Sequence, residues 1–187
     1  MTPKPASAPI PTLGVVELSS IPKGLLVCDL MLKKAQVRVL RAAPVGCGKF
    51  LITLTGDEGS LQEAVDEGRA AAGAHLVAFS YLPNVHPAVV RALAGTAPAE
   101  AILDAVGALE AHSLAGLIRA ADLAAKTAAV RLLELTFDRD LTLTGTLSDV
   151  EAALEAAERL LAAEGQLLHR EIIARPHEGM DAIVLGK

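Results

Sequence analysis

The chain has 187 residues, of which 52% are apolar, 21% are charged and only 2% are aromatic. A net charge of −5 and scattered basic residues exclude a general nucleic-acid binder and a polybasic membrane anchor. No apolar run reaches the roughly 18–20 residues that cross a bilayer, and Cys28 and Cys47 are too few for a disulfide framework. Residues 1–11 are Pro/Ala-rich and lack an apolar signal core, so we expect a flexible tail on a cytoplasmic protein with free thiols.

The first predicted elements are an apolar strand at residues 13–18 and a helix. Ser19 or Ser20 is suited to cap this helix, and Pro22 fits its first turn. The apolar residues of the helix recur at helical spacing, which predicts an inward stripe of Leu25, Cys28, Leu32 and Ala35. Cys28 is therefore expected to be a small core residue.

The first half of the chain continues with a hairpin, a second helix and a last strand. The expected elements are two hairpin strands, a helix, a strand and a short helix, at 37–45, 50–55, 58–72, 75–82 and near 87–94. The inward face of the second helix is predicted to be Leu61, Ala64, Val65, Gly68 and Ala72. The resulting order β-α-β-β-α-β is the split βαβ plan.

The second half of the chain repeats the first. At an offset of 93, ten residues of 13–40 are identical in 106–133, among them Glu17/Glu110, Asp29/Asp122 and Lys33/Lys126. Beyond residue 50 the offset becomes 89, so the second copy lacks four residues between its hairpin strands. Its second helix is predicted to face inward with Val150, Ala153, Leu154, Ala157 and Leu161. We therefore expect two tandem α+β domains, at about 12–95 and 96–187.

Several stretches of the chain resemble the bacterial microcompartment shell family. GVVELSSIPKGLLVCDLMLKKAQVRVL followed by GKFLITLTGD looks like one shell domain, and ARPHEGM at 174–180 resembles the PRPH-type segment at shell subunit edges. Two such domains in one chain resemble the tandem shell proteins, and most of all the propanediol-utilisation type whose pore carries an iron–sulfur cluster. The resemblance implies two ferredoxin-like domains, each an antiparallel sheet with helices on one face.

The resemblance also implies how the protein assembles and acts. A homotrimer would mimic a hexamer, because each chain supplies two of six wedges. Its flat tiles would pack edge to edge with other shell proteins, and its β-hairpin turns would line a central pore for metabolites or electrons. Enclosed redox enzymes are implied as further partners, and the shell of a microcompartment in the cytoplasm as the location.

The turn between the two hairpin strands of the first copy supplies the expected pore-lining residues, Gly46, Cys47, Gly48 and Lys49. In a trimer Cys47 occurs three times, and three thiolates can hold a [4Fe–4S] or [3Fe–4S] cluster. The glycines permit close approach of the backbone, and Lys49 favours the thiolate. In the cluster-bearing relatives this segment resembles CPGKF, so Gly46 stands at the family's cysteine position and the thiol is shifted by one residue. A cluster ligand, a free pore thiol and a buried cysteine remain three alternatives.

The second copy has a different hairpin turn, Asp138-Arg139-Asp140, without glycine. We expect this turn to stop short of the threefold axis, so that the three first-domain loops frame the pore. The alternative is a surface turn without a function.

The family resemblance also implies residues at the edges between tiles. Lys33 and Lys126 match the edge lysine of the family, whereas the alternative is a solvated helix lysine. Arg175 matches the edge arginine, and its first-copy counterpart is Asn84, so the two edges are not equivalent. His86 and His177 pair across the repeat and stand without a second ligand at helical spacing, so edge packing is expected rather than metal binding. The expected assembly interface is thus Lys33, Lys126, Asn84, His86, Arg175 and His177.

The sequence favours a structural protein over an enzyme. It has no GxSxG and no phosphate loop, because GCGK lacks both the upstream glycine spacing and the following Ser or Thr. Glu17 and Glu110 recur at equivalent strand ends, and the repeat itself explains them. The alternative function is a regulatory module that binds a small ligand between its repeats and does not assemble into a shell.

Overall fold

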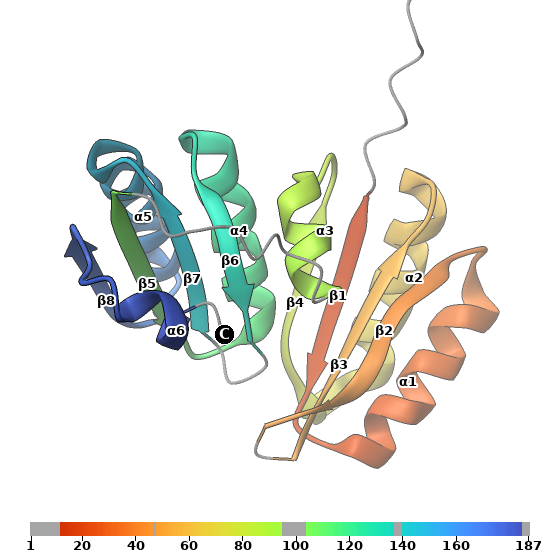
Figure 1. Cartoon of the computed structure of the whole chain (residues 1–187). Coiled ribbons are helices and arrows are strands. Elements are labelled where there is room, and N and C mark those ends of the chain that lie inside the picture. Colours follow the sequence, from red (N-terminus) through yellow and green to blue (C-terminus); the bar gives the residue numbers. More distant parts are fainter. Residues whose placement is uncertain (1–11, 47, 95–103, 137–139, 185–187) are drawn as a thin grey trace, which may run out of the picture.

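The structure is a computed structural model that describes residues 12–46, 48–94, 104–136 and 140–184. Two four-stranded antiparallel sheets stand side by side (Figure 1). Sheet 1 has the strand order β2-β3-β1-β4 and sheet 2 the order β6-β7-β5-β8. The same order in both halves confirms the predicted repeat of a β-α-β-β-α-β unit. The proposed tail at residues 1–11 lies outside the described residues.

The first domain closely follows the predicted elements. Its elements are β1 (Leu13–Leu18), α1 (Ile21–Lys34), β2 (Arg38–Val45), β3 (Lys49–Thr55), α2 (Glu58–Ala72), a 3₁₀ turn (Gly73–His75), β4 (Leu76–Leu82) and α3 (Pro87–Leu93). The Ser20 side chain caps α1 by accepting from the Lys23 N–H, and Asp57 caps α2 by accepting from the Ser60 N–H. The predicted buried face of α2 is confirmed.

The second domain repeats these elements with shorter hairpin strands. They are β5 (Ala105–Ala111), α4 (Leu114–Thr127), β6 (Arg131–Leu135), β7 (Asp140–Gly145), α5 (Leu147–Ala163), β8 (Leu167–Ala174) and α6 (Met180–Val184). Ser113 caps α4 and Thr146 caps α5, at the positions equivalent to Ser20 and Asp57. The predicted inward face of α5 is confirmed. Within the described segments, no helix is both long and apolar enough to cross a membrane.

The predicted inward stripe of α1 is wrong for Leu25 and Leu32, whereas Cys28 and Ala35 pack, partly buried, against the domain 1 core. The helix buries Gly24, Val27 and Met31 against its own sheet, whereas Leu25 is 61% exposed and Leu32 is 45% exposed. Cys28 is only partly buried, at the border of the domain 1 core. The apolar spacing on α1 is real, but its two leucines, Leu25 and Leu32, lie exposed on the outer side of the helix.

The two domains share a continuous core at one junction. Alternate residues of β1 point to opposite faces of sheet 1: Val16 and Leu18 join the core under α1 and α2, whereas Leu13 and Val15 join the core that contains α4. Helix α4 thus covers its own sheet and also packs against β4 and β1 of domain 1. We call this contact between α4 and sheet 1 the domain junction.

Candidate functional site

The predicted pore loop is the turn of the β2–β3 hairpin. Its strands are paired up to Val45 and Lys49, directly beside the turn. Gly46 is exposed, and Gly48 has a φ of +76°, in the left-handed region that favours glycine. A Cβ built on Gly48 would meet nothing within 4 Å, so the backbone there is open to close approach. Cys47, the expected cluster ligand, lies outside the described residues.

Lys49 begins β3, and its amine is held in the domain junction. Its Nζ lies 3.0 Å from Glu17 Oε1 and 3.4 Å from the carbonyl oxygen of His112. The Lys49 side chain is 21% exposed, and Glu17 is fully buried. The positive charge expected beside Cys47 is therefore largely balanced by a buried carboxylate.

The same carboxylate also caps helix α4 from the other domain. Glu17 Oε2 accepts the N–H of Leu114 at 2.7 Å and the N–H of Ala115 at 3.2 Å. The N-terminus of a helix carries unsatisfied N–H groups and a partial positive charge, so it stabilises an anion there. Glu17 thus ties the pore-loop strand to the second domain through one buried carboxylate with two charged or partly charged partners.

Two further hydrogen bonds complete the domain junction. The Ser80 hydroxyl donates to the Ala115 carbonyl oxygen at 2.9 Å, and the His86 N–H donates to Asp122 Oδ1 at 2.7 Å. Sequence reasoning missed this junction. The signal was present in the repeat, because Glu17 and Asp122 each have an identical counterpart, Glu110 and Asp29.

The counterpart of Glu17 in domain 2 has none of these partners. Glu110 is exposed, and its cross-strand neighbours are Asp140 on β7 and His169 on β8. Strands β6 and β7 have five and six residues, against eight and seven in β2 and β3. The shorter hairpin fits the predicted turn that stops short; of that turn, Asp138 and Arg139 lie outside the described residues and Asp140 opens β7.

The two predicted edge lysines occupy equivalent places in the last turns of α1 and α4. Lys33 pairs with Asp29 at 2.6 Å, and Lys126 pairs with Asp122 at 2.5 Å. The Lys33 side chain is 71% exposed and that of Lys126 is 40% exposed. Because each lysine already has an intrahelical carboxylate, its amine keeps two further protons for an acceptor on a neighbouring tile.

The other predicted edge residues also form equivalent local structures. Asn84 and Arg175 both adopt a left-handed backbone, with φ of 56° and 47°. His86 Nδ1 accepts the Ala88 N–H at the start of α3, and His177 Nδ1 accepts the Gly179 N–H. The two histidines shape their turns, and no group of three potential metal-ligating side chains occurs in the described part of the chain.

Cys28 is the free cysteine that the structure places. Burial and, to a smaller extent, the neighbouring Asp29 carboxylate raise the pKa of its thiol above the ordinary value. A thiol with a raised pKa is a poor nucleophile and a poor metal ligand at neutral pH. Cys28 therefore has the properties of a packing residue, although it packs at the border of the core rather than within it.

Comparisons with known proteins agree with this architecture. A family model described as the BMC domain matches residues 12–85 and 105–176. The "Bacterial microcompartment shell protein PduT" of Citrobacter freundii is 37% identical over 174 residues, which cover 90% of this chain and 94% of that protein. A crystal structure of a microcompartment protein from Desulfitobacterium hafniense has a TM-score of 0.78 and 36% identity, and covers 91% of this chain and 98% of its own.

Proposed function

The chain belongs to the BMC-domain family and is a structural protein of the bacterial microcompartment shell, and we propose that three copies close into a ring by repeating the domain junction between chains. Within one chain, α4 lies on the open face of sheet 1. Among the described residues, α1, its counterpart, packs against its own sheet 1, and α4 and α5 pack against sheet 2 on its core side. A head-to-tail contact of the same kind would bury the outer face of α1 of one chain against the open face of sheet 2 of the next. Three such contacts close a ring around an axis.

The observation that carries this proposal is the exposed apolar stripe of α1. At the offset of 93, Leu25 corresponds to Ile118 and Cys28 to Ala121, and both residues of α4 are fully buried. Leu25 by contrast is 61% exposed. We propose that the exposed apolar face of α1 becomes buried in the assembly, where a neighbouring chain covers it.

The open face of sheet 2 offers the matching surface. Glu110 stands where Glu17 stands in sheet 1, and in the ring it faces the N-terminus of α1 from the next chain. The N–H of Ile21 there is free to bond it, but Pro22, the counterpart of Ala115, has no N–H. The junction between chains therefore has one hydrogen bond fewer than the junction within a chain. It also lacks the lysine, because the counterpart of Lys49 at the offset of 89 is Asp138.

We also propose that the three β2–β3 loops meet at the ring axis and line the pore with Gly46, Cys47, Gly48 and Lys49. The open space at Gly48 and the exposed Gly46 fit a loop that approaches its symmetry mates closely. Each ring supplies three Cys47 thiols, which are suited to a [4Fe–4S] or [3Fe–4S] cluster. Such a cluster would supply one-electron transfer across the shell. This chain contributes the thiol, the flanking glycines and a lysine whose charge Glu17 neutralises.

The edge residues place further shell proteins around the ring. Lys33 and Lys126, with the left-handed turns of Asn84 and Arg175, are proposed to contact neighbouring tiles, and enclosed redox enzymes are proposed partners of the pore. The proposed role is structural, and a shell pore needs no acid, base and nucleophile in the chain.

Native mass spectrometry of the purified chain tests the ring. We expect a species of three times 19.3 kDa, and a view down its axis in electron microscopy with the β2–β3 loops at the centre. A monomer at micromolar concentration, or loops at the outer rim, would overturn the proposal. For the cluster, an anaerobic preparation should be brown and lose its visible absorption in Cys47→Ser, whereas a colourless protein that resists reconstitution would remove the cluster and leave the ring intact.

A further inference from the structure

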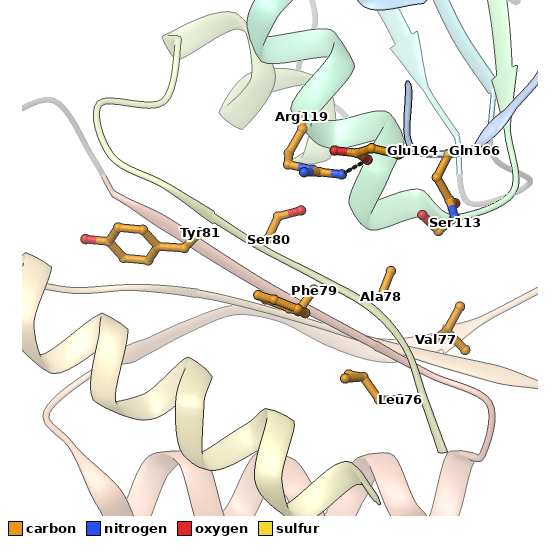
Figure 2. Close-up of a pocket in the computed structure, with 10 residues that line it drawn as sticks. All are labelled: Leu76, Val77, Ala78, Phe79, Ser80, Tyr81, Ser113, Arg119, Glu164 and Gln166. Atoms are coloured by element: carbon orange, nitrogen blue, oxygen red, sulfur yellow. Dashed lines mark hydrogen bonds and ion pairs between the residues drawn. The ribbon is translucent and has the colours of Figure 1, made fainter. Parts of the chain in front are cut away.

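A groove of about 510 Å³ runs along β4 between the two domains (Figure 2). Its first wall is the strand itself, residues 76–81. Its second wall belongs to domain 2 and consists of Ser113, Arg119, Glu164 and Gln166. In sheet 1, β4 is an edge strand, so one side of its backbone faces this groove.

Strand β4 carries none of the usual protection of an edge. Its sequence LVAFSYL has no charged residue and no proline. Edge strands of stable proteins are commonly blocked by charges or by proline, because an unblocked edge pairs with another strand. An apolar strand of this kind, left open beside a groove of this length, is suited to accept a further strand.

Strand β8, the counterpart in domain 2, shows what a blocked edge looks like in the same fold. A similar groove of about 530 Å³ runs along it, but it is lined by His169, Arg170 and Glu171. By register, Phe79 pairs with Val16 and Arg170 pairs with Leu109, the counterpart of Val16, so Arg170 stands in the place of Phe79. The chain therefore protects one of two equivalent edges with charge and leaves the other apolar.

The second wall of the β4 groove holds two polar atoms without a partner. Among the described residues, Arg119 Nε and Gln166 Oε1 are buried and make no hydrogen bond, although the Arg119 guanidinium pairs with Glu164 through another nitrogen. A carbonyl oxygen complements the first atom and an N–H the second. Peptide groups carry both, so a small rotation of these side chains lets an added backbone or its polar side chains satisfy them.

We infer that this groove binds an extended segment of another protein, which adds to the edge of sheet 1 beside β4 as a further strand. One side of the added strand faces Val77, Phe79 and Tyr81 and suits apolar, β-branched residues. The other side faces the wall of Ser113, Arg119 and Gln166 and suits uncharged polar residues. Main-chain hydrogen bonds to the edge supply affinity, and this alternation supplies specificity.

The N-terminal segment that the structure does not describe is a poor occupant. Residues 1–11 contain Pro3, Pro5, Pro9 and Pro11, each of which lacks the N–H that a strand needs. The two walls leave room along the strand for a thin, extended segment, so we take a segment of a different protein as the occupant and treat a second copy as an outcome of the test.

Synthetic peptides test the inference directly. The probe is a set of fluorescein-labelled peptides of about eight residues, with alternating Val and Thr and a lysine at each end, measured by fluorescence anisotropy. We expect saturable binding to the whole protein. N-methylation of alternate residues removes the donors on one side of the peptide only, so one methylation pattern should weaken binding roughly tenfold or more and the other should not.

Two substitutions locate the binding site. Phe79→Glu puts a charge on the β4 edge and gives it Arg69 as a partner, since that guanidinium already lies 3.7 Å from the Phe79 ring centroid. We expect roughly tenfold weaker binding or more, with an unchanged circular dichroism spectrum. Leu168→Glu puts the same charge on an exposed apolar residue of the β8 edge, two residues before the counterpart of Phe79, and should leave binding unaffected.

The outcomes are distinct from those of ring formation, because native mass spectrometry of the same samples reports the trimer independently. No saturable binding by any peptide of the set overturns the inference. So do equal effects of both methylation patterns, and loss of binding in Leu168→Glu instead of Phe79→Glu. Dimerisation of rings that Phe79→Glu abolishes, without peptide binding, would assign the edge to a second copy and equally overturn it.

Discussion

The two halves of the chain share one plan but differ in how much of it a single chain completes. Domain 1 has a helix seated on its open sheet face, a buried Glu17 and a lysine beside it, whereas domain 2 has a bare sheet face and an exposed Glu110. Likewise α4 is covered on both sides, and α1 on one side only. One chain thus contains a complete junction between α4 and sheet 1. It also has the two surfaces of a second junction, the outer face of α1 and the open face of sheet 2. We therefore model the contact between chains on the junction within a chain.

We expect the largest difference between the two domains in the effects of substituting Glu17 and Glu110 on the free energy of unfolding. Glu17→Ala leaves Lys49 and two helix N–H groups without their buried anion, and removing one partner of a buried ion pair typically costs about 3–5 kcal/mol. We expect a loss of this size in the free energy of unfolding by urea. Glu110→Ala removes an exposed side chain and should change the stability of the isolated chain by less than about 0.5 kcal/mol.

Equal effects of these two substitutions would contradict the assignment of Glu17 to the junction. Glu17→Gln gives a milder control, because the amide oxygen can still accept one N–H of α4 while the charge is lost. Its effect should fall between those of Glu17→Ala and the wild type.

The unfinished junction can be broken without harming the fold. Leu25→Glu places a charge on the stripe of α1 that the next chain covers, where an unpaired charge costs several kcal/mol of association energy. We expect a monomer by native mass spectrometry at concentrations where the wild type is a trimer, with the same circular dichroism spectrum. Ile118→Glu, the matched change on α4, should instead unfold the chain, because that residue is buried within it.

A control on the same helix separates charge from position. Lys34→Glu changes the charge of α1 away from the stripe and should keep the trimer. If Leu25→Glu also remains trimeric, the exposed stripe is not the contact between chains.

The interiors of the two domains differ where a glycine meets an aromatic ring. A Cβ on Gly24 would lie 2.4 Å from the Phe50 ring, so α1 approaches β3 only because this residue is glycine. The counterpart of Gly24 in domain 2 is Leu117, which is fully buried, and the counterpart of Phe50 is Arg139. The apolar side chain of this pair thus belongs to the strand in domain 1 and to the helix in domain 2.

The contact between Gly24 and Phe50 predicts that substitutions of these two residues have coupled effects on the free energy of unfolding. Gly24→Ala should destabilise the chain by about 1–3 kcal/mol through overpacking, and Phe50→Leu should recover part of that loss. A double-mutant cycle in urea should give a coupling energy of about 0.5–3 kcal/mol. Additive effects of the two substitutions would show that α1 can move away from β3 at little cost.

The sequence was sufficient for the fold and insufficient for the junction. The repeat, the cap at Ser20 and the inward faces of α2 and α5 are local patterns, and the structure confirms them. The stripe of Leu25, Cys28 and Leu32 was assigned to the wrong side because periodicity shows that a face is apolar but not which neighbour covers it.

The role of Glu17 was missed for a related reason. Its partners on α4 are 97 and 98 residues away, and no spacing rule connects them. Lys49 was expected at the pore, and the sequence did not show that its amine also contacts the same carboxylate.

The smallest predicted difference concerns Cys28, whose counterpart Ala121 is fully buried in the domain junction. Burial and the Asp29 carboxylate raise the pKa of this thiol, so its alkylation by iodoacetamide should be slow at neutral pH and should accelerate as the pH rises. The folded chain disfavours the thiolate more than the unfolded chain does, so the contribution of this group to stability is lost as the pH rises through the folded-state pKa.

In the trimer the next chain covers the thiol, and its alkylation at a given pH should be roughly tenfold slower or more than in the Leu25→Glu monomer. Asp29→Asn in that monomer should lower the thiol pKa and speed the reaction. Equal alkylation rates in trimer and monomer would mean that α1 keeps its outer face open to solvent in the ring, and a different surface would then have to close it.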